Sequence, residues 1–230
     1  MKTNFKVLFF GRKNDIYSKK IEKILKKNFV KVKSKWIDFQ NKNQRIDKKL
    51  FNVDILISFR SYYIFKSKEI NMIKKIAINF HPGPPKYRGY GCANYAIYNN
   101  DKFYGVTSHI INTKIDKGNI IDVKYFKINN KNITLNKLLH LTYKNQIIQV
   151  NKVIKNIKRF AVGNIKKIKI PAVKEKWSKK IGTKKKLDKF YEIEKNISKK
   201  NLLRKIRSTK TENFKPYIKL YNNRFYYNDN

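Results

Sequence analysis

Short apolar runs alternate with helix-like patterns along the first 80 residues. The apolar runs have the length of buried strands, and the segments between them carry isoleucine and leucine at the spacing of an amphipathic helix. One segment alternates lysine with valine, serine and tryptophan, which predicts a half-exposed strand. Strands that alternate with helices favour a doubly wound α/β fold with a mostly parallel sheet. The predicted strands are 5–10, 30–36, 53–59 and 76–80, and the predicted helices are 14–27 and 66–74.

The second half of the chain is less regular. It predicts one more strand at 120–126 and a long helix at 134–158, whose apolar side chains recur at helical spacing. Pro171 and the lysine-rich stretch that follows it predict a connection that leaves the main domain. We therefore expect a main domain at residues 1–170 and a small C-terminal unit at 171–230.

The C-terminal unit predicts one helix and one β-hairpin. Ser198 precedes a helical stretch that ends near Arg207, and serine is a favoured N-cap. Two aromatic runs between residues 217 and 227 flank Asn222 and Asn223, a pair that tolerates the positive φ of a hairpin turn.

Composition narrows the class of protein. The formal charge is +41, but arginine supplies few of the 56 basic residues and the lysines are spread along the whole chain. Surfaces that read bases or clamp phosphates favour arginine, so a nucleic-acid partner is not expected. The lone cysteine, Cys92, excludes an internal disulfide, and no apolar run approaches the roughly 18 residues of a membrane span. We expect a cytoplasmic protein whose lysine-rich surface attracts anionic ligands.

An Asn and a His stand two residues apart where one predicted strand ends. In Ala-Ile-Asn-Phe-His-Pro-Gly-Pro-Pro, Asn79 and His81 lead into a proline-glycine loop. Residues two apart on a strand share a face, so the amide and the imidazole should converge at the carboxyl end, where open α/β sheets bind ligands. An isolated Asn-x-His is also typical of an asparagine that caps a turn beside an ordinary strand-end histidine.

A second motif adds a carboxylate to this pair. The sequence Gly-Val-Thr-Ser-His-Ile-Ile-Asn-Thr-Lys-Ile-Asp-Lys-Gly places His109 on an alternating strand and Asp116 at the end of the following loop. By residue type alone, His81, His109 and Asp116 also match a facial metal triad. The sequence offers no second shell of carboxylates, however, and a metal site leaves Asn79 without a role.

In this order, the motifs resemble the folate-dependent formyltransferase family, which includes methionyl-tRNA formyltransferase and the sugar N-formyltransferases. The resemblance covers about residues 5–126. It implies a Rossmann-like formyltransferase fold with its catalytic domain in the N-terminal part. It also implies 10-formyltetrahydrofolate as co-substrate, no metal, catalysis by Asn79, His81 and Asp116, and a supporting role for His109.

The proline-rich loop indicates a branch of the family. The sequence from Pro82 to Pro85 is shorter than the Ser-Leu-Leu-Pro of many members and looks like the sugar-modifying branch. The resemblance therefore implies formyl transfer to a nucleotide-linked 4-amino or 3-amino dideoxyhexose, for lipopolysaccharide or a similar surface polysaccharide. Methionyl-tRNA formyltransferase is the alternative, for which we expect a larger C-terminal domain. A basic nucleic-acid-binding protein that has lost catalysis is the second alternative.

The resemblance also implies where the folate binds. Its pterin should lie against the backbone of Tyr62, Tyr63 and Ile64, with residues 111–116 on the other side. In the C-terminal hairpin, exposed tyrosines are expected to pack along an edge, and the hairpin is also compatible with base stacking or a homodimer contact.

Overall fold

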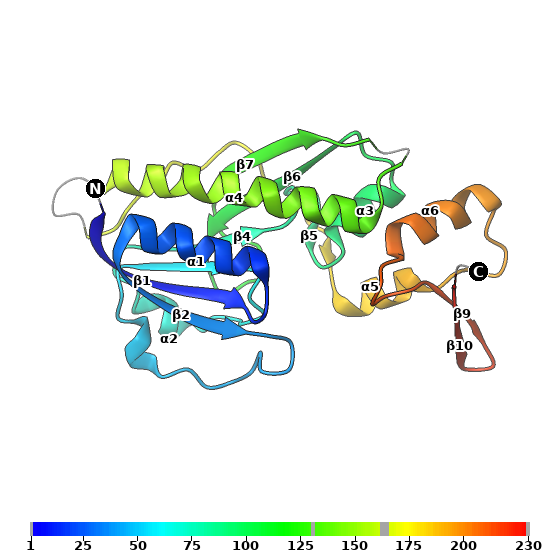
Figure 1. The fold of residues 1–230 in the computed structure, drawn as a ribbon, viewed down its shortest axis with the longest axis horizontal. Coiled ribbons are helices and arrows are strands. Elements are labelled where there is room, and N and C mark those ends of the chain that lie inside the picture. The colour runs from blue at the N-terminus through cyan, green and yellow to red at the C-terminus, as the bar shows by residue number, and fades with distance from the viewer. Residues whose placement is uncertain (1, 130–131, 162–165, 229–230) are drawn as a thin grey trace. The chain divides into compact units, whose positions relative to one another are not determined.

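The computed structural model describes residues 2–129, 132–161 and 166–228. Its centre is a six-stranded sheet with strand order β2-β1-β3-β4-β6-β7 (Figure 1). The first four of these strands are parallel, and β6 runs antiparallel to β4. The predicted α/β fold with a mainly parallel sheet is therefore confirmed. The strands are β1 Thr3–Arg12, β2 Phe29–Ile37, β3 Ile55–Phe59, β4 Ile76–His81, β6 Phe103–Ile110 and β7 Ile120–Lys127.

Helices cover both faces of this sheet. α1 begins where the Asp15 carboxylate accepts a hydrogen bond from the Ser18 amide, 2.7 Å away, and so satisfies one of the free donors of the first turn. In Figure 1, α1 and α4 lie on one side of the strands and α2 lies on the other. The helices of this part are α1 Ile16–Asn28, the short 3-10 helix η1 Lys48–Phe51, α2 Ser67–Asn71 and α4 Leu135–Phe160. η1 is absent from the predicted elements.

Alternating residues of the buried strands supply two apolar layers. Val7 and Phe9 of β1 pack with α1 and α4, whereas Leu8 and Phe10 pack with η1 and the loop after β3. This period of two is what places neighbouring strand residues on opposite faces. The continuous apolar run in the sequence thus marks a strand that is covered on both sides.

Contacts between residues divide the chain into two compact units. The first comprises Met1–Pro82, Val106–Lys124 and Tyr143–Lys176, and the second comprises Gly83–Gly105, Tyr125–Thr142 and Trp177–Asn230. The predicted domain boundary near residue 170 remains a prediction.

The second unit is built from short elements around a small apolar core. Cys92, Ala96, Tyr104 and Leu138 are buried in that core. Ser198 caps α6 as predicted, with its hydroxyl accepting from the Asn201 amide. The elements of this unit are β5 Arg88–Gly89, α3 Cys92–Tyr98, β8 Ile181–Gly182, α5 Lys184–Tyr191, α6 Lys199–Thr209, β9 Tyr217–Leu220 and β10 Asn223–Tyr226.

Two local expectations for this unit were wrong. The lysine-rich stretch through Lys186 was expected to be a connection, but α5 begins within it, because the Thr183 hydroxyl caps the helix and the ring of Phe190 packs against Tyr95 at 4.9 Å. The hairpin turns on Tyr221 and Asn222, with φ of 46° and 68°, rather than on the Asn-Asn pair. The Tyr221 side chain is 98% exposed.

A backbone clasp joins the segment 177–182 to the loop that follows His81. The Ser178 amide donates to the Pro85 carbonyl at 3.0 Å, and the Tyr90 amide donates to the Gly182 carbonyl at 2.9 Å. β5 and β8 pair in parallel between these two bonds. A Cβ atom at Gly182 would lie 2.1 Å from the Tyr90 carbonyl oxygen, so only glycine permits this approach.

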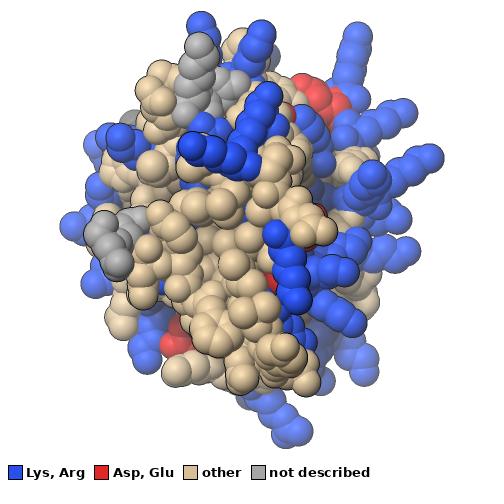
Figure 2. Space-filling view, turned by 90° about the vertical axis from the view of Figure 1, so that its right-hand side faces the viewer, with Lys and Arg blue, Asp and Glu red and all other residues tan. Residues whose placement is uncertain are grey.

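Lysine and arginine side chains protrude around the edge of the face shown in Figure 2, whose middle is mostly uncharged, and acidic residues are sparse there. Within the ranges that the structure describes, no helix is long and apolar enough to cross a bilayer.

We expect Gly182→Ala to lower the free energy of unfolding by about 2 kcal/mol or more, because the added methyl group collides with backbone that the clasp holds in place. Urea unfolding measures the change. Lys180→Ala, an exposed substitution in the same segment, should stay within about 0.5 kcal/mol of wild type. Equal stability of the two variants would contradict the clasp.

Candidate active site

Three polar side chains meet where β4 and β6 pair. The antiparallel register places Asn79 opposite His109 and His81 opposite Thr107. Side chains of directly opposed residues are neighbours, and Asn79 Nδ2 lies 3.1 Å from His109 Nε2. Asn79 and His81 are two residues apart on β4 and therefore share a face.

Asp116 reaches this group from the loop that follows β6. Its backbone adopts a φ of 43°, a left-handed conformation that aspartate tolerates better than most residues. A Cβ atom at Gly118 would lie 1.7 Å from the Ile110 carbonyl oxygen, so glycine is needed for the loop to return this close to the strand. The Ile-Asp-x-Gly sequence thus shapes the turn that presents the carboxylate.

The Asp116 carboxylate is shared between two imidazoles. His81 Nδ1 lies 3.1 Å from Oδ2 and His109 Nε2 lies 3.2 Å from Oδ1. Asn79 Nδ2 adds a longer contact of 3.5 Å to Oδ1. Burial alone would raise the pKa of Asp116, but the two histidines outweigh it and hold that pKa well below its ordinary value of 3.8. The carboxylate is therefore ionised at neutral pH.

Hydrogen bonds fix the orientation of both rings. His109 Nδ1 lies 2.9 Å from the Ile110 carbonyl oxygen, to which it donates, so Nε2 faces Asn79 and Asp116. His81 engages Asp116 through Nδ1. Its Nε2 is then the ring atom that can meet a substrate.

A second polar cluster lies at the carboxyl ends of β1 and β3. Arg60 follows β3 with a φ of 55°, donates to Asp15 at 2.6 Å, and lies 3.7 Å from the centre of the Tyr143 ring. Arg12, the last residue of β1, donates to the Tyr62 hydroxyl at 2.6 Å and stacks 4.6 Å from its ring. Sequence reasoning did not find this cluster.

This cluster carries two guanidinium groups and one carboxylate. Burial and the nearby charge of Arg12 lower the pKa of Arg60. Arg12 Nε is buried, and it has no hydrogen-bond partner among the residues described. β1 lies between β2 and β3 in the sheet, so strand order reverses here, and open α/β sheets bind ligands at such a point.

The predicted folate-binding residues lie in the loop between β3 and α2. Tyr63 is buried, and its hydroxyl donates to Glu69 at 2.6 Å; burial and this bond raise the pKa of Tyr63. Tyr62 contacts Arg12, whereas the Ile64 side chain is 62% exposed. These side chains face different surroundings, so a common ligand would have to contact their backbone. Their role remains a prediction.

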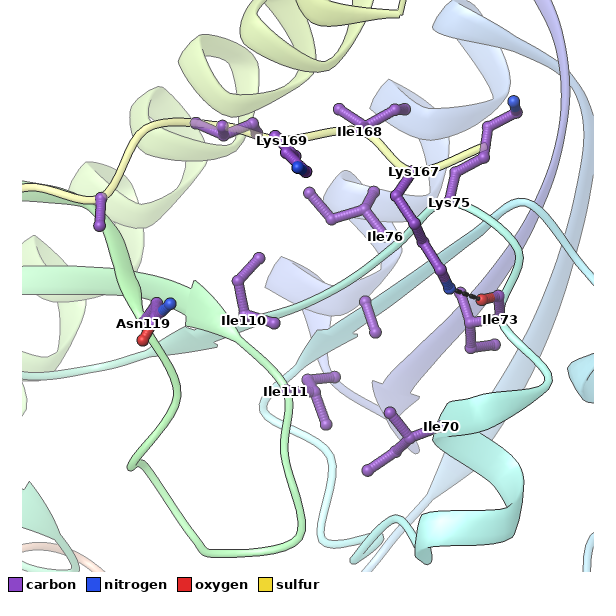
Figure 3. Close-up of a pocket in the computed structure, with 13 residues that line it drawn as sticks. Ile70, Ile73, Lys75, Ile76, Ile110, Ile111, Asn119, Lys167, Ile168 and Lys169 are labelled. Atoms are coloured by element: carbon purple, nitrogen blue, oxygen red, sulfur yellow. Dashed lines mark hydrogen bonds between the residues drawn. The ribbon is translucent and has the colours of Figure 1, made fainter. Parts of the chain in front are cut away.

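A cavity of about 400 Å³ lies next to this region (Figure 3). Seven of its thirteen lining residues are isoleucines, one each from α2, β4 and β6 and the others from the segments that follow these elements or lie at 168–170. Lys167 reaches across to the Ile73 carbonyl, 2.6 Å away. Of the predicted folate contacts only Ile111 lines it. The cavity therefore adjoins the predicted pterin position without coinciding with it.

Among the described residues, no group of three or more His, Cys, Asp or Glu side chains has an arrangement that could hold a metal ion.

Residues 6–153 match the family model described as formyl transferase. The matched region contains Asn79, His81, His109 and Asp116 and covers more than half of the chain. The chain belongs to the formyl transferase family. The family predicted from the order of the motifs is thus confirmed.

One curated relative and two solved structures illustrate this likeness. The methionyl-tRNA formyltransferase of Borreliella afzelii (strain PKo) is 40% identical over 78 residues, which span 34% of this chain but only 25% of that protein. A 4-N formyltransferase from Francisella tularensis is 20% identical, with a TM-score of 0.73 over 96% of both chains. The N-formyltransferase of Helicobacter canadensis, solved with folinic acid and dTDP-3-aminofucose, is 23% identical, with a TM-score of 0.68 over 88% of this chain and 80% of that one. The two structures confirm the fold class.

We expect Asp116→Asn to reduce stability most near neutral pH. A lowered pKa in the folded state stabilises the fold above the unfolded pKa of about 4, and this contribution is lost as pH falls below that value. The difference in unfolding free energy between wild type and Asp116→Asn should therefore shrink between pH 6 and pH 3 in urea titrations. The exposed Asp188→Asn should show a small difference at both pH values. If the difference in unfolding free energy between wild type and Asp116→Asn does not change with pH, the pKa of Asp116 is not lowered.

Proposed function

We propose that this protein is an N-formyltransferase that moves the formyl group of 10-formyltetrahydrofolate to the amino group of a nucleotide-linked amino sugar. The observation that carries the proposal is the convergence of Asn79, His81 and His109 on the Asp116 carboxylate, each within 3.5 Å of one of its oxygens. An amide, an imidazole and an ionised carboxylate side by side are the groups that acyl transfer to an amine requires.

Asn79 and His81 are the proposed oxyanion donors. When the amine attacks, the formyl oxygen gathers negative charge, and preorganised donors stabilise it by about 3 to 4 kcal/mol each. A carboxamide has two N–H donors, so one of them can remain directed at His109 Nε2 and the Asp116 carboxylate while the other meets the oxyanion. His81, whose Nδ1 donates to the ionised Asp116, can also donate through Nε2 when its ring is protonated.

Asp116 is the proposed proton acceptor. The new bond joins the amine nitrogen to the formyl carbon, and the bond from that carbon to folate N10 breaks. The proton that the amine loses passes to Asp116, directly or through a water, and then to N10. Because the pKa of Asp116 is lowered, the carboxylate is ionised beforehand and holds the proton only briefly.

Two relatives support the choice of donor and acceptor. The Helicobacter canadensis enzyme was solved with folinic acid, a folate, and with an amino sugar joined to dTDP. The Francisella tularensis 4-N formyltransferase aligns over nearly the whole of both chains. Methionyl-tRNA formyltransferase is the second candidate, favoured by the 40% identity of the Borreliella relative.

The arginine cluster supports an anionic acceptor. Arg12 and Arg60 end adjacent strands at the reversal of strand order, and a single carboxylate, that of Asp15, offsets their charge. In a chain that uses lysine almost everywhere, two arginines at one strand edge suggest bidentate contact with phosphate oxygens. The cluster lies at the ends of β1 and β3, and β3 is the strand next to β4, which carries the Asn-His pair.

Incubation with 10-formyltetrahydrofolate and a panel of dTDP-, GDP- and UDP-linked amino sugars tests the reaction. We expect one sugar to gain the mass of a single formyl group while tetrahydrofolate appears. Initiator methionyl-tRNA serves as the competing acceptor. Formylation of the tRNA and of none of the sugars would replace the proposed substrate with the second candidate.

Asn79→Ala and His81→Ala should each lower kcat by about 100- to 1000-fold, the usual effect of losing an oxyanion donor. Circular dichroism and thermal unfolding verify the fold of each variant. His140→Ala, a histidine on α4 outside the site, should retain wild-type kcat. Near-normal turnover in both test variants would contradict the assigned roles.

Arg12→Gln and Arg60→Gln should raise KM for the nucleotide sugar by about 10- to 100-fold, because each removes a charge-assisted hydrogen bond. KM for the folate should stay near wild type. Arg45→Gln makes the same change of charge at an exposed position and is the matched control. Equal effects of all three on KM would show that only overall charge matters.

A further inference from the structure

Two buried glutamines lie on the face of α4 that packs against the sheet. Gln146 and Gln149 have no exposed surface, and they share this face with apolar residues such as Val150 and Val153. Each donates through Nε2 to a strand carbonyl, and the Oε1 of each is buried without a hydrogen-bond partner among the residues described. An unpaired buried amide oxygen is costly, so an apolar side chain of the same length would pack at least as favourably. Packing alone does not explain these glutamines.

Gln146 contacts the backbone of the proposed active site. Its Nε2 donates to the carbonyl oxygen of Phe80, 3.0 Å away, and Phe80 is the residue between Asn79 and His81. The Ala77 carbonyl accepts from a residue that follows β6. Because carbonyls alternate between neighbours along a strand, the Phe80 carbonyl faces the β3 side.

β3 ends next to Phe80 of β4. Phe59, its last residue, is the partner of Phe80, and the next residue, Arg60, turns away with a φ of 55°. The pairing of β3 with β4 therefore ends at Phe80, the residue between Asn79 and His81. Gln146 supplies a side-chain donor at this point, from the helix face that packs against the sheet.

We infer that Gln146 is a positioning residue for formyl transfer. By holding the Phe80 carbonyl, it fixes the peptide unit between Phe80 and His81, and so sets the end of β4 that carries Asn79 and His81 relative to Asp116. The inference rests on the proposed roles of Asn79 and His81 and adds a group that does not touch the substrate. Misplacement of reacting groups by about 1 Å costs on the order of 100-fold in rate.

Gln146→Met tests the inference because it keeps the length of the side chain and removes the donor. We expect kcat to fall about 10- to 100-fold while both KM values stay within about threefold. Gln149→Met is the matched control: it removes an equally buried amide from the same helix face, but one that bonds Val106 and Asp122. It should lose similar thermal stability and keep kcat within about threefold. A kcat for Gln146→Met within twofold of wild type, or an equal loss in Gln149→Met, would overturn the inference.

Gln146→Glu provides a second measurement, whose result a purely structural role of Gln146 would not change. A glutamate here can donate to the Phe80 carbonyl only when protonated. The ratio of its kcat to that of Gln146→Met should therefore rise as pH is lowered, because the two variants differ only in the side chain at position 146. If Gln146→Met does not fold, the ratio to wild type serves instead. A ratio that is constant with pH would overturn the inference.

The outcome is separable from that of the proposed function. Loss of turnover in Asn79→Ala together with normal kcat in Gln146→Met would leave the reaction standing and remove only the positioning role. If the wild-type chain formylates a different amine, the same comparison of Gln146→Met with Gln149→Met applies to that substrate.

Discussion

The buried Asp116 carboxylate is the constraint on which the candidate site depends. A charge removed from water is costly unless it is paired, and here two imidazoles and one amide surround it. Because the carboxylate needs these partners, His81 and His109 must remain on adjacent strands at a fixed separation. The same electrostatics that keep the loop in place therefore also keep the proposed reacting groups aligned.

The sheet achieves this alignment by reversing one strand. β6 runs antiparallel to β4, so its last residues lie beside the end of β4 and place His109 opposite Asn79. The loop that leaves β6 needs only a few residues to bring Asp116 back to the same edge. A glycine two positions later lets that loop pass within contact distance of the strand backbone.

Sequence patterns identified the parts of the molecule whose signals are local. Apolar runs indicated the parallel strands because these are buried on both faces, and the spacing of Asn79 and His81 indicated their common side. The contribution of Gln146 could not be inferred from the chain, because it depends on where β3 stops and spans 66 positions to Phe80. Two glutamines three residues apart within an apolar helix stripe were the available signal. For Arg12 and Arg60, the signal was the use of a rare basic residue directly after two buried strands.

The backbone clasp makes the loop after His81 depend on residues almost a hundred positions further along the chain. If a protease cut the chain between these two segments, the clasp would hold together two separate polypeptides instead of two parts of one chain. At low concentration these polypeptides would dissociate more readily. Pro85 and Tyr90 would then exchange protein hydrogen bonds for water. Trimming of the C-terminal half would in this way loosen the residues that follow β4 without altering β4 itself.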